Sequence, residues 1–474
     1  MTRSKTVRPG VHSFDRLSVI AIAESVEGRR RSAVDVVRDA IARADAYEAV
    51  QPAVWISRVA KNALLAQAHD VDERNAAEEH LPLAGVPFAI KDNIDLAGEA
   101  TTAACPDFAY TPETSATVVQ RLVAAGAVPI GKTNLDQFAT GLSGTRSPYG
   151  ALGAVYNRDF ISGGSSSGSA VAVAAGLVAF ALGTDTAGSG RVPAAFNHLV
   201  GLKPTKGRWS TSGVVPACRS LDCVTVLSST VADAARVDEI AAGFDDGDPF
   251  SRHAPERGST RVPDKFRVGV PDRLERLSDN QSERLFDAAL QRVVAMGGMP
   301  VEIDMSPLSA AARLLYQGPW VAERTAAIET LLAANPAAIH PVVREIVEGG
   351  CRYSALDAFK AEYELRALQR DAERLWKAVD VLLLPTAPTT YRITEMLADP
   401  VALNANLGLY TNFVNLLDMS AIAVPAGFRD NRTGFGVTFI APAWDDRKLL
   451  DVAQRYEDHA PMPVPPPLDL GEHP

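Results

Sequence analysis

Two glycine-rich turns that carry hydroxyl side chains lie in the middle of this 474-residue chain. The first, residues 163–169, reads G-G-S-S-S-G-S, and the second, residues 183–190, reads G-T-D-T-A-G-S-G. A serine hydroxyl can act as a nucleophile, and glycine allows the backbone N–H groups of a tight turn to approach a ligand and hold an oxyanion. The pattern therefore indicates covalent catalysis at Ser165 or Ser189.

A linker is the alternative interpretation, because Gly/Ser-rich segments usually connect domains. Here, however, the first turn is followed directly by A-V-A-V-A-A-G-L-V-A-F-A-L at residues 170–182, which has the composition of a buried helix followed by a strand. Such a segment must be buried for the chain to be soluble. Both turns are therefore expected inside a folded core.

A serine nucleophile needs a base within hydrogen-bond reach. The chain has eight histidines, and of these only His198 lies near the two turns, in a segment typical of packing residues. Lys91 is the better candidate, because it ends the apolar run at residues 83–90, and a charged residue at the end of a core strand lies where α/β proteins bind ligands. Burial among neutral neighbours lowers the pKa of a lysine and populates the amine. We therefore expect Lys91 to act as the base.

The composition is that of an ordinary soluble globular protein, with 47% hydrophobic and 22% charged residues. The net charge of −10 gives no long-range attraction for nucleic acid or an anionic membrane, so neither is expected as a partner. No apolar run is long enough to span a bilayer. A cytoplasmic protein with reduced cysteines is predicted, because the four cysteines lack the paired spacing of a zinc or redox site: Cys105, Cys218, Cys223 and Cys351.

Helical and strand-like patterns alternate along the chain. Apolar residues at helical spacing predict helices at residues 32–47, 117–125 and 279–296, with mostly helical sequence at 309–379. Short apolar runs predict strands at residues 83–90, 127–130, 267–271, 379–390 and 436–440. The alternation predicts a mostly parallel sheet with helices on its faces.

One formal motif match is rejected because of its context. Residues 126–133, G-A-V-P-I-G-K-T, fit the phosphate-loop pattern G-x-x-x-x-G-K-T. That loop needs a strand before its first glycine and a flexible polar segment between the glycines. Here a predicted helix precedes Gly126, and an apolar strand containing Pro129 follows it. Nucleotide binding is therefore not expected.

Three motifs together resemble the amidase signature family of Ser-Ser-Lys hydrolases. They are Lys91-Asp92-Asn93, the turn at residues 163–169, and T-D-T-A-G-S-G-R-V-P-A-A-F at 184–196 followed by G-L-K-P-T at 201–205. The resemblance implies the amidase signature fold, an α/β architecture with a mixed, mostly parallel central sheet covered by helices on both faces. It predicts one catalytic domain over residues 1–460, with a helical N-terminal segment at 15–80, a signature core at 81–245, a loop at 244–266, a helical substrate-binding excursion at 275–378, and a proline-rich tail at 461–474.

The same resemblance implies the role of each site residue. Ser189 would be the acyl-accepting nucleophile, Ser165, after a cis peptide bond, would relay the proton, and Lys91 would be the base. The oxyanion hole would be formed by the backbone N–H groups of Thr186, Ala187, Gly188 and Ser189. The turns would be held by side chains that do not react, namely Ser166, Ser167, Asp185 and Arg191. No metal and no cofactor are implied.

Finer motifs resemble the allophanate hydrolases. They are P-F-A-I-K-D-N-I-D-L-A-G at 87–98, G-K-T-N-L-D-Q-F-A-T-G-L at 131–142, T-A-G-S-G-R-V-P-A-A-F-N at 186–197, K-G-R-W-S at 206–210 and L-L-Y-Q-G-P-W-V-A-E-R at 314–324. Ala187 is informative, because other branches of the family usually carry a glycine there. The resemblance implies cleavage of the C–N bond of allophanate (urea-1-carboxylate) with release of ammonia, in urea or s-triazine nitrogen catabolism.

The same resemblance implies which residues bind the negative charge of this substrate. In allophanate hydrolases a tyrosine and an arginine eight residues apart hold the substrate carboxylate, and Tyr316 and Arg324 fit that pattern. Arginine suits the task, because its planar guanidinium donates two hydrogen bonds to a carboxylate. The alternative is that both are ordinary residues on the surface of a helix.

Two features depart from the allophanate hydrolase pattern. Many members continue into a C-terminal domain linked to the carboxylated product, whereas this chain stops at Pro474, so we expect either a stand-alone amidase domain or a truncated one. His198 stands where asparagine is expected, and Ser143 lies in a variable loop, so the pocket could differ.

Three alternative functions stay open. The substrate could be another urea-derived amide, such as biuret or guanylurea, or the chain could be an amidotransferase-type amidase subunit that feeds ammonia to a partner. The pair of Tyr316 and Arg324 argues against this amidotransferase role. A non-catalytic binding module is the third alternative, and the presence of Lys91, Ser165 and Ser189 argues against it. The expected ligand is a small anionic ureide, and the chain is expected to form a homodimer.

Overall fold

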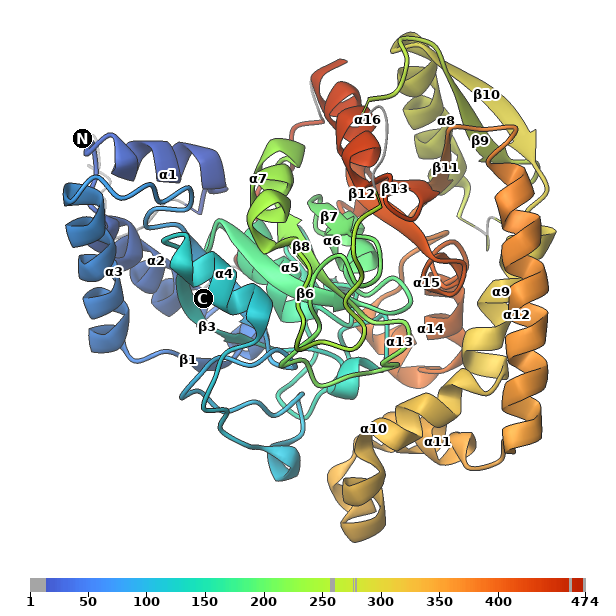
Figure 1. Ribbon diagram of the computed structural model, residues 1–474, viewed down its shortest axis with the longest axis horizontal. Helices are drawn as coiled ribbons and strands as arrows, with labels where there is room; N and C mark the ends of the chain where they lie inside the picture. The colour runs from blue at the N-terminus through green and yellow to red at the C-terminus, as the bar shows by residue number, and fades with distance from the viewer. Residues whose placement is uncertain (1–13, 256–260, 276, 278, 460–462, 472–474) are drawn as a thin grey trace, which may run out of the picture.

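The computed structural model of the chain describes residues 14–255, 261–275, 277, 279–459 and 463–471. Within these residues, eleven strands form one sheet that crosses the molecule in the order β1-β3-β2-β6-β8-β7-β12-β13-β11-β9-β10 (Figure 1). Strands β4 (Gly153–Ala154) and β5 (Asn157–Ile161) form a separate hairpin. The strands of the large sheet are β1 (Trp55–Arg58), β2 (Pro87–Lys91), β3 (Val128–Thr133), β6 (Phe180–Asp185), β7 (Val200–Lys203), β8 (Cys223–Ser228), β9 (Phe266–Pro271), β10 (Gly298–Ile303), β11 (Val381–Pro385), β12 (Met419–Phe428) and β13 (Gly434–Pro442).

Helices flank this sheet. Helices α5 and α6 contact each other and the central strands, while α7, α8 and α16 pack against strands of the same sheet in a second group. The helices are α1 (Val19–Glu27), α2 (Ala33–Tyr47), α3 (Lys61–Ala76), α4 (Thr117–Ala124), α5 (Ser167–Ala174), α6 (Arg191–Phe196), α7 (Val231–Ala241), α8 (Asn280–Ala295), α9 (Ser306–Gln317), α10 (Trp320–Ala334), α11 (Pro341–Gly350), α12 (Ala355–Leu375), α13 (Ile393–Ala398), α14 (Ala402–Leu407), α15 (Phe413–Leu416) and α16 (Asp446–His459).

The α/β class and the mixed sheet are confirmed, but the sheet has fewer parallel pairs than expected. Four of its ten neighbouring pairs are parallel, namely β2 with β3 and β6, and β9 with β10 and β11. The other six pairs are antiparallel. The physical reason is that β12 and β13 are consecutive and form a long antiparallel pair, while β8 runs opposite to both of its neighbours. Simple alternation of helices and strands did not reveal these connections.

Local sequence explains where the N-terminal helices begin. The Ser32 side chain caps α2 by accepting a hydrogen bond from the N–H of Asp35 at 3.0 Å, which satisfies a donor that the helix itself leaves free. One face of α2 is buried, at Val36, Val37 and Ala40 among others, as its apolar spacing predicts.

The segment that matched the phosphate-loop pattern is a strand. Residues 128–133 all belong to β3, so the G-K-T sequence lies in the sheet and forms no loop. The Lys132 ammonium lies 3.0 Å from Asp92 Oδ1, and both side chains are fully buried. This ion pair explains why a lysine is present inside the sheet.

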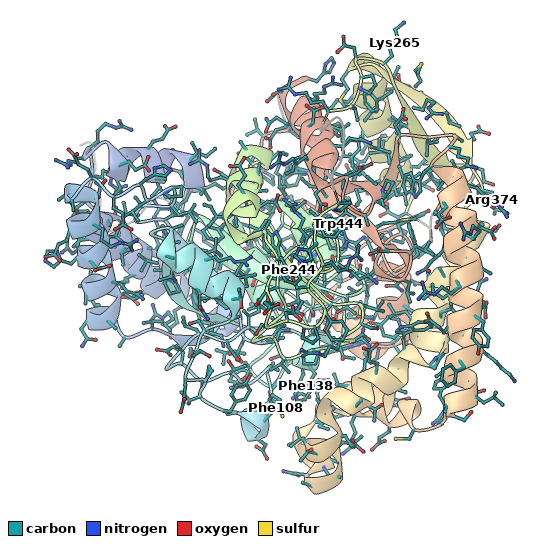
Figure 2. All side chains as sticks on the ribbon, viewed as in Figure 1. Phe108, Phe138, Phe244, Lys265, Arg374 and Trp444 are labelled. Atoms are coloured by element: carbon teal, nitrogen blue, oxygen red, sulfur yellow. The ribbon has the colours of Figure 1, made fainter. Side chains whose placement is uncertain are left out.

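The long excursion after β10 carries helices α9 to α12 away from the sheet, on the right of Figure 1. Its inner end is joined to the signature core by a cluster of buried apolar side chains from α10, α11 and the loops after β2 and β3. Phe138 belongs to this cluster and packs edge-on against Phe108, with ring centroids 5.3 Å apart (Figure 2). The cluster as a whole, with Ile328 of α10 and Val343 of α11, packs the excursion against the loops of the signature core.

The two segments predicted to lack regular structure lie only partly within the described residues. Residues 256–260 of the predicted loop, and 460–462 and 472–474 near the C-terminal end, are outside them. Residues 463–471 form neither helix nor strand. They lie along the β4–β5 hairpin, where the Asp469 N–H donates to Val155 O at 2.8 Å and the Asp469 carboxylate pairs with Arg158 at 3.5 Å.

Candidate active site

Lys91 is the last residue of β2, and its side chain is completely buried. The Nζ atom donates hydrogen bonds to Ser165 Oγ and to Thr184 Oγ1, each at 2.7 Å. Burial lowers the pKa of Lys91 from 10.5 to about 7, against the opposing effect of the carboxylates of Asp136, Asp222 and Asp185. A substantial fraction of this lysine is therefore a neutral amine near neutral pH, as a general base requires.

Ser165 follows a cis peptide bond from Gly164 and lies just before α5. The cis bond agrees with the family resemblance. The Ser165 carbonyl accepts a hydrogen bond from the N–H of Asp136 at 3.1 Å. Gly164 is required next to it, because a Cβ at this position would clash with the Asp136 carboxylate. The close approach of these two segments directs the Ser165 hydroxyl toward Lys91.

Ser189 lies in the turn between β6 and α6. Its hydroxyl donates a hydrogen bond to Gly141 O at 3.3 Å, and its carbonyl accepts one from the N–H of Ser166 at 3.2 Å. The second contact joins the two serine turns directly. Ser166 also supports β6, because its hydroxyl donates to Thr184 O at 3.2 Å.

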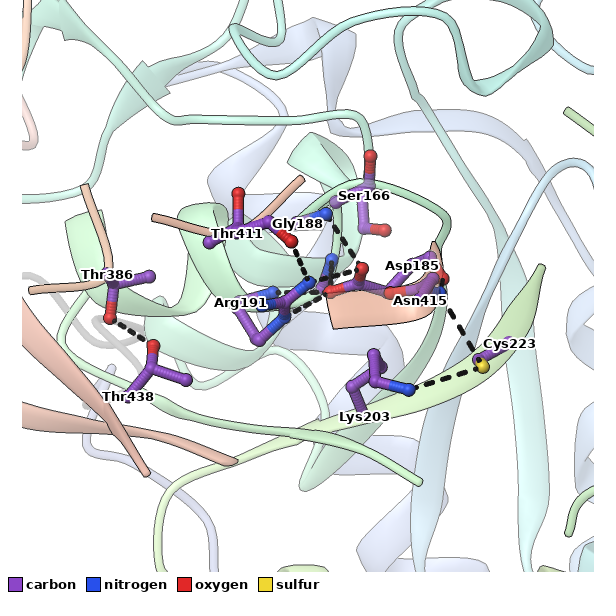
Figure 3. Close-up of polar contacts among 12 residues, drawn as sticks. Ser166, Asp185, Gly188, Arg191, Lys203, Cys223, Thr386, Thr411, Asn415 and Thr438 are labelled. Carbon is purple, nitrogen blue, oxygen red and sulfur yellow. Dashed lines mark hydrogen bonds and ion pairs between the residues drawn. The ribbon is translucent and has the colours of Figure 1, made fainter. Parts of the chain in front are cut away.

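A buried carboxylate organises the turn that carries Ser189. Asp185 ends β6 and forms a two-pronged ion pair with Arg191, in which Nε and Nη2 each lie 2.9 Å from a carboxylate oxygen (Figure 3). Burial by itself would raise the pKa of Asp185, but the Arg191 charge and hydrogen bonds outweigh it and lower that pKa. The carboxylate also accepts the N–H of Gly188 at 2.7 Å. Asp185 and Arg191 therefore hold the strand and the turn together.

This geometry bears on the four backbone donors predicted for the oxyanion hole. Because the Gly188 N–H already donates to Asp185, it is occupied in the structure. The other three predicted donors are the N–H groups of Thr186, Ala187 and Ser189. The Thr186 side chain is held by a short hydrogen bond to the Asp222 carboxylate, which also accepts the N–H of Ala217 at 2.8 Å.

The structure brings Tyr316 and Arg324 together although they belong to different helices, α9 and α10. Arg324 Nη2 donates to Tyr316 Oη at 3.3 Å, and the guanidinium carbon lies 5.1 Å from the centre of the tyrosine ring. Arg324 is only 2% exposed, and its Nε has no hydrogen-bond partner among the described residues. The chain breaks between the helices at Gly318, so the two residues do not share one continuous helix.

The loop at residues 140–141 contacts both Arg324 and Ser189. Arg324 Nη1 donates to Thr140 Oγ1 at 3.1 Å, and the next residue, Gly141, accepts the Ser189 hydroxyl at 3.3 Å. Adjacent residues of the chain therefore contact the guanidinium and the hydroxyl. The arrangement places a buried positive charge beside the serine, where a small anion could be bound.

Sequence reasoning missed several residues of this site. Thr184 and Gly141 lie inside the quoted motifs at 184–196 and 131–142, but neither was given a role. Asp136 lies in the same motif and accepts three backbone N–H groups, from Ser143, Gly144 and Arg146. No sequence signal identified Asp222, because nothing in the surrounding sequence indicates that it contacts the turn.

Two absences within the described residues bear on the class of site. No group of three or more His, Cys, Asp and Glu side chains there is arranged to hold a metal ion. None of the helices in the same residues combines the length and the apolar character needed to cross a membrane.

Comparisons with known proteins agree with the geometry. A family model described as Amidase matches residues 35–450. The urea amidolyase of Lachancea kluyveri is 47% identical over 405 residues, which cover 85% of this chain and 22% of that protein. A glutamyl-tRNA(Gln) amidotransferase subunit from Thermosynechococcus vestitus is 35% identical over 467 residues, which cover 91% of this chain and 96% of that protein.

A solved structure, the allophanate hydrolase of Kluyveromyces lactis, superposes with a TM-score of 0.89 at 41% identity, covering 94% of this chain and 73% of that one. This chain spans about a fifth of the length of the Lachancea kluyveri urea amidolyase. Both the family match and the identities extend over most of the chain, and the matched residues 35–450 include both serine turns and Lys91. The chain belongs to the amidase family.

Proposed function

We propose that this protein is an amidohydrolase that cleaves the C–N bond of allophanate and releases ammonia through an acyl-enzyme at Ser189. The observation that carries the proposal is the loop at residues 140–141, which contacts the Arg324 guanidinium with one residue and the Ser189 hydroxyl with the next. An amide substrate with a carboxylate at its other end fits this spacing, because its charge can lie on Arg324 and Tyr316 while its carbonyl faces Ser189. Similarity to the urea amidolyase and the allophanate hydrolase supports the same substrate.

Acylation would begin with proton transfer from Ser189. The Ser189 hydroxyl leaves Gly141 O and donates to Ser165 Oγ, while Ser165 passes its own proton to the neutral amine of Lys91. The Ser189 oxygen then bonds to the substrate carbonyl carbon, whose electrons move onto the carbonyl oxygen. Lys91 serves as base because burial lowers its pKa to about 7.

The resulting oxyanion would be bound by the backbone N–H groups of Thr186, Ala187 and Ser189. Each such donor is typically worth about 3–4 kcal/mol in the transition state. These N–H groups can bind the oxyanion only if the turn keeps its position during the reaction. The Asp185–Arg191 ion pair provides that rigidity, because it is buried and makes two hydrogen bonds.

Collapse of the intermediate breaks the C–N bond, and the leaving nitrogen takes a proton that returns from Lys91 through Ser165. Ammonia departs, and the acyl group stays on Ser189. Water then adds to the acyl carbon by the same proton route in reverse, which frees Ser189 and the carboxylated product. Every step uses side chains and backbone N–H groups of this chain together with the substrate and water.

The experiment measures ammonia released from freshly prepared allophanate by the purified chain. We expect Ser189→Ala, which removes the nucleophile, to lower kcat by about 10⁶, and Arg324→Met to raise KM strongly for allophanate. The uncharged amide biuret is the comparison substrate, because it has no carboxylate for Arg324 to bind. If biuret is cleaved well and Arg324→Met has no effect, the Ser-Ser-Lys chemistry stands and the substrate assignment is wrong.

An amidotransferase role is a second candidate, since the similarity to the glutamyl-tRNA(Gln) amidotransferase protein covers almost the whole of both chains. A chain of this kind would release ammonia from glutamine and depend on its partner. Activity of the isolated chain on allophanate, with none on glutamine, would exclude this candidate.

We also propose that the chain forms a homodimer and acts in the cytoplasm. Light scattering on the purified protein should give twice the 50.4 kDa mass of the chain. A mass of one chain would contradict the dimer and leave the proposed chemistry unchanged.

A further inference from the structure

A cavity of about 550 Å³ opens beside the site, between α9, α10, α11 and α14. Its volume lies in the range of 300–1,000 Å³ that is typical of small-molecule sites. The helices that enclose it are at the lower right of the molecule in Figure 1. Ser189 and Lys91 do not line it, so the cavity is distinct from the catalytic residues themselves. The side chains that matter for the argument are Arg146, Tyr316, Glu345, Gly349, Arg352 and Asn404.

The inner wall of this cavity is built on the loop that contacts Ser189. Arg146 Nη1 donates to Thr140 O at 2.9 Å, and Asn404 Oδ1 accepts the N–H of Leu142 at 2.8 Å. These two contacts bracket Gly141, whose carbonyl accepts the Ser189 hydroxyl. A third lining residue, Tyr316, accepts a hydrogen bond from Arg324 at 3.3 Å. The cavity therefore ends at the carboxylate-binding arginine and the loop beside the serine.

The charge of this wall is positive. Arg146 is 2% exposed, and its Nε has no hydrogen-bond partner within the described part of the chain. Neither Arg146 nor Arg324 forms an ion pair with any described carboxylate, unlike the buried Arg191. Burial lowers the pKa of Arg146, and the nearby Arg324 lowers it further, against the raising effect of Asp136 and Tyr316. Two buried guanidiniums that form no ion pair with a described carboxylate favour an anion of their own.

The outer part of the cavity adds one more cation and one anion. Arg352 is exposed and follows the end of α11, while Glu345 lies on the same helix. The lining therefore carries two arginines against one glutamate, in a protein whose net charge is −10. A concave positive surface on an acidic protein concentrates anions locally.

We propose that this cavity is the entrance through which the anionic substrate reaches Arg324, and that Arg146 is a second cation that selects for negative charge at its inner end. The inference rests on the proposed function, because it takes the substrate to be a small anionic ureide. Arg352 at the outer part would attract the substrate, Arg146 would hold it at the inner wall, and Arg324 with Tyr316 would bind its carboxylate beside Ser189.

Gly349 offers a direct way to close the entrance without disturbing the fold. It lies in the last turn of α11, lines the cavity, and a Cβ at this position would meet no heavy atom within 4 Å. Gly349→Trp should therefore fill the cavity and leave the packing intact. The matched control is Ala367→Trp on the exposed face of α12, which adds the same indole far from the cavity lining.

We expect Gly349→Trp to lower kcat/KM for allophanate by at least about tenfold, and Ala367→Trp to change it by less than about twofold. Thermal unfolding of both variants checks that they fold. A second variant, Arg352→Gln, should raise KM for allophanate about threefold at low salt, lose that effect at high salt, and leave biuret cleavage unchanged. Equal activity of the two tryptophan variants would overturn the entrance, although the proposed function would stand.

A readout that needs no turnover separates the two proposals. After subtraction of the emission of the five native tryptophans, measured in the wild-type protein, iodide should quench the tryptophan introduced at position 349 more strongly, relative to neutral acrylamide, than the one at position 367. Adding Arg352→Gln to Gly349→Trp should reduce this preference, because it removes a positive charge from the lining. If allophanate is not hydrolysed and iodide is still preferred, the anion entrance stands and the substrate assignment fails. Equal iodide-to-acrylamide ratios at both positions would overturn the entrance.

Discussion

At the scale of single residues, Lys91 decides how the site responds to pH. Its side chain is completely buried, and its hydrogen-bond partners within the described residues are the neutral hydroxyls of Ser165 and Thr184. No ion pair among the described residues stabilises its charged form. Three more distant carboxylates oppose the effect of burial without cancelling it, and the pKa falls to about 7. The pH dependence of catalysis and the pH dependence of the free energy of unfolding should both reflect this lowered pKa.

The pH profile of kcat/KM should rise with pH, with a midpoint near 7, and reach a plateau above it. The physical reason is that only the neutral amine of Lys91 can take the proton from Ser165, and this form is populated above the pKa of about 7. Lys91→Arg should lower kcat by about 10²–10⁴ at all pH values, because arginine stays protonated. A profile that is flat or falls between pH 6 and 8 would contradict the assignment of the base.

The same lysine should make the protein less stable at low pH. Its pKa is 10.5 in the unfolded chain and about 7 in the fold, so the unfolded state binds more protons between these values and the free energy of unfolding rises with pH in that window. Relative to Lys91→Met, the wild-type protein should therefore lose about 2–3 kcal/mol between pH 9 and pH 6. Urea unfolding at both pH values measures this difference. An equal difference between the two proteins at both pH values would mean that Lys91 is not buried as a neutral amine.

At the scale of elements, the turn after β6 depends on one buried ion pair. Asp185 belongs to β6 and Arg191 begins α6, so their contact closes the turn that carries Ser189. The carboxylate also fixes the Gly188 N–H, and Gly188 has a φ of 131° that few other residues adopt. Strand, turn and helix are thus one unit, and the position of Ser189 depends on it.

Asp185→Asn should lower the free energy of unfolding by about 3–5 kcal/mol, because it leaves the Arg191 charge buried without a counter-ion. Catalysis should fall as well, since the turn loses its anchor. Denaturant unfolding and kcat measure the two effects. The control is Asp371→Asn, which breaks an exposed pair with Arg374 on α12 and should cost less than about 0.5 kcal/mol. Similar losses in both variants would mean that the buried pair has no special role.

At the scale of the whole molecule, the site is completed by segments far apart in the sequence. Strand β12 lies between β7 and β13 in the sheet, and the chain just before it, at residues 411–416, packs against the Ser189 turn. Asn415 donates to Asp185 O at 2.7 Å and to Leu221 O at 2.8 Å. One amide therefore connects the C-terminal part of the chain to the end of β6, where the turn begins, and to the segment just before β8.

Asn415→Ala should lower the free energy of unfolding by about 2–3 kcal/mol, because two buried carbonyl groups lose their donor. It should also lower kcat by about tenfold, since the turn can shift from its reactive geometry. Asn406→Ala is the control, because it lies in the same part of the chain and its bond to Tyr391 Oη is only partly buried. Equal effects of both changes on kcat would show that the contact with the turn is unimportant.

The amino-acid sequence by itself determined which residues could be recognised as the candidate site. Lysine, two serines and their glycines occur in long, ordered motifs, and the resemblance of these motifs to the amidase signature family implied a role for each of them. The helices at 32–47 and 279–296 were also predictable, because capping residues and apolar spacing are local properties. Their ends agree with the predicted ranges within one residue.

Only the tertiary structure decided what surrounds these residues. Asp222, Asn415 and the cavity beside Tyr316 depend on contacts between segments that are distant in the sequence, and nothing in the local pattern records such contacts. The directions of the strands were missed for the same reason, since a pattern shows that a strand exists but not which neighbour it pairs with. The occupied N–H of Gly188 likewise depends on where the Asp185 carboxylate points, which the fold alone determines.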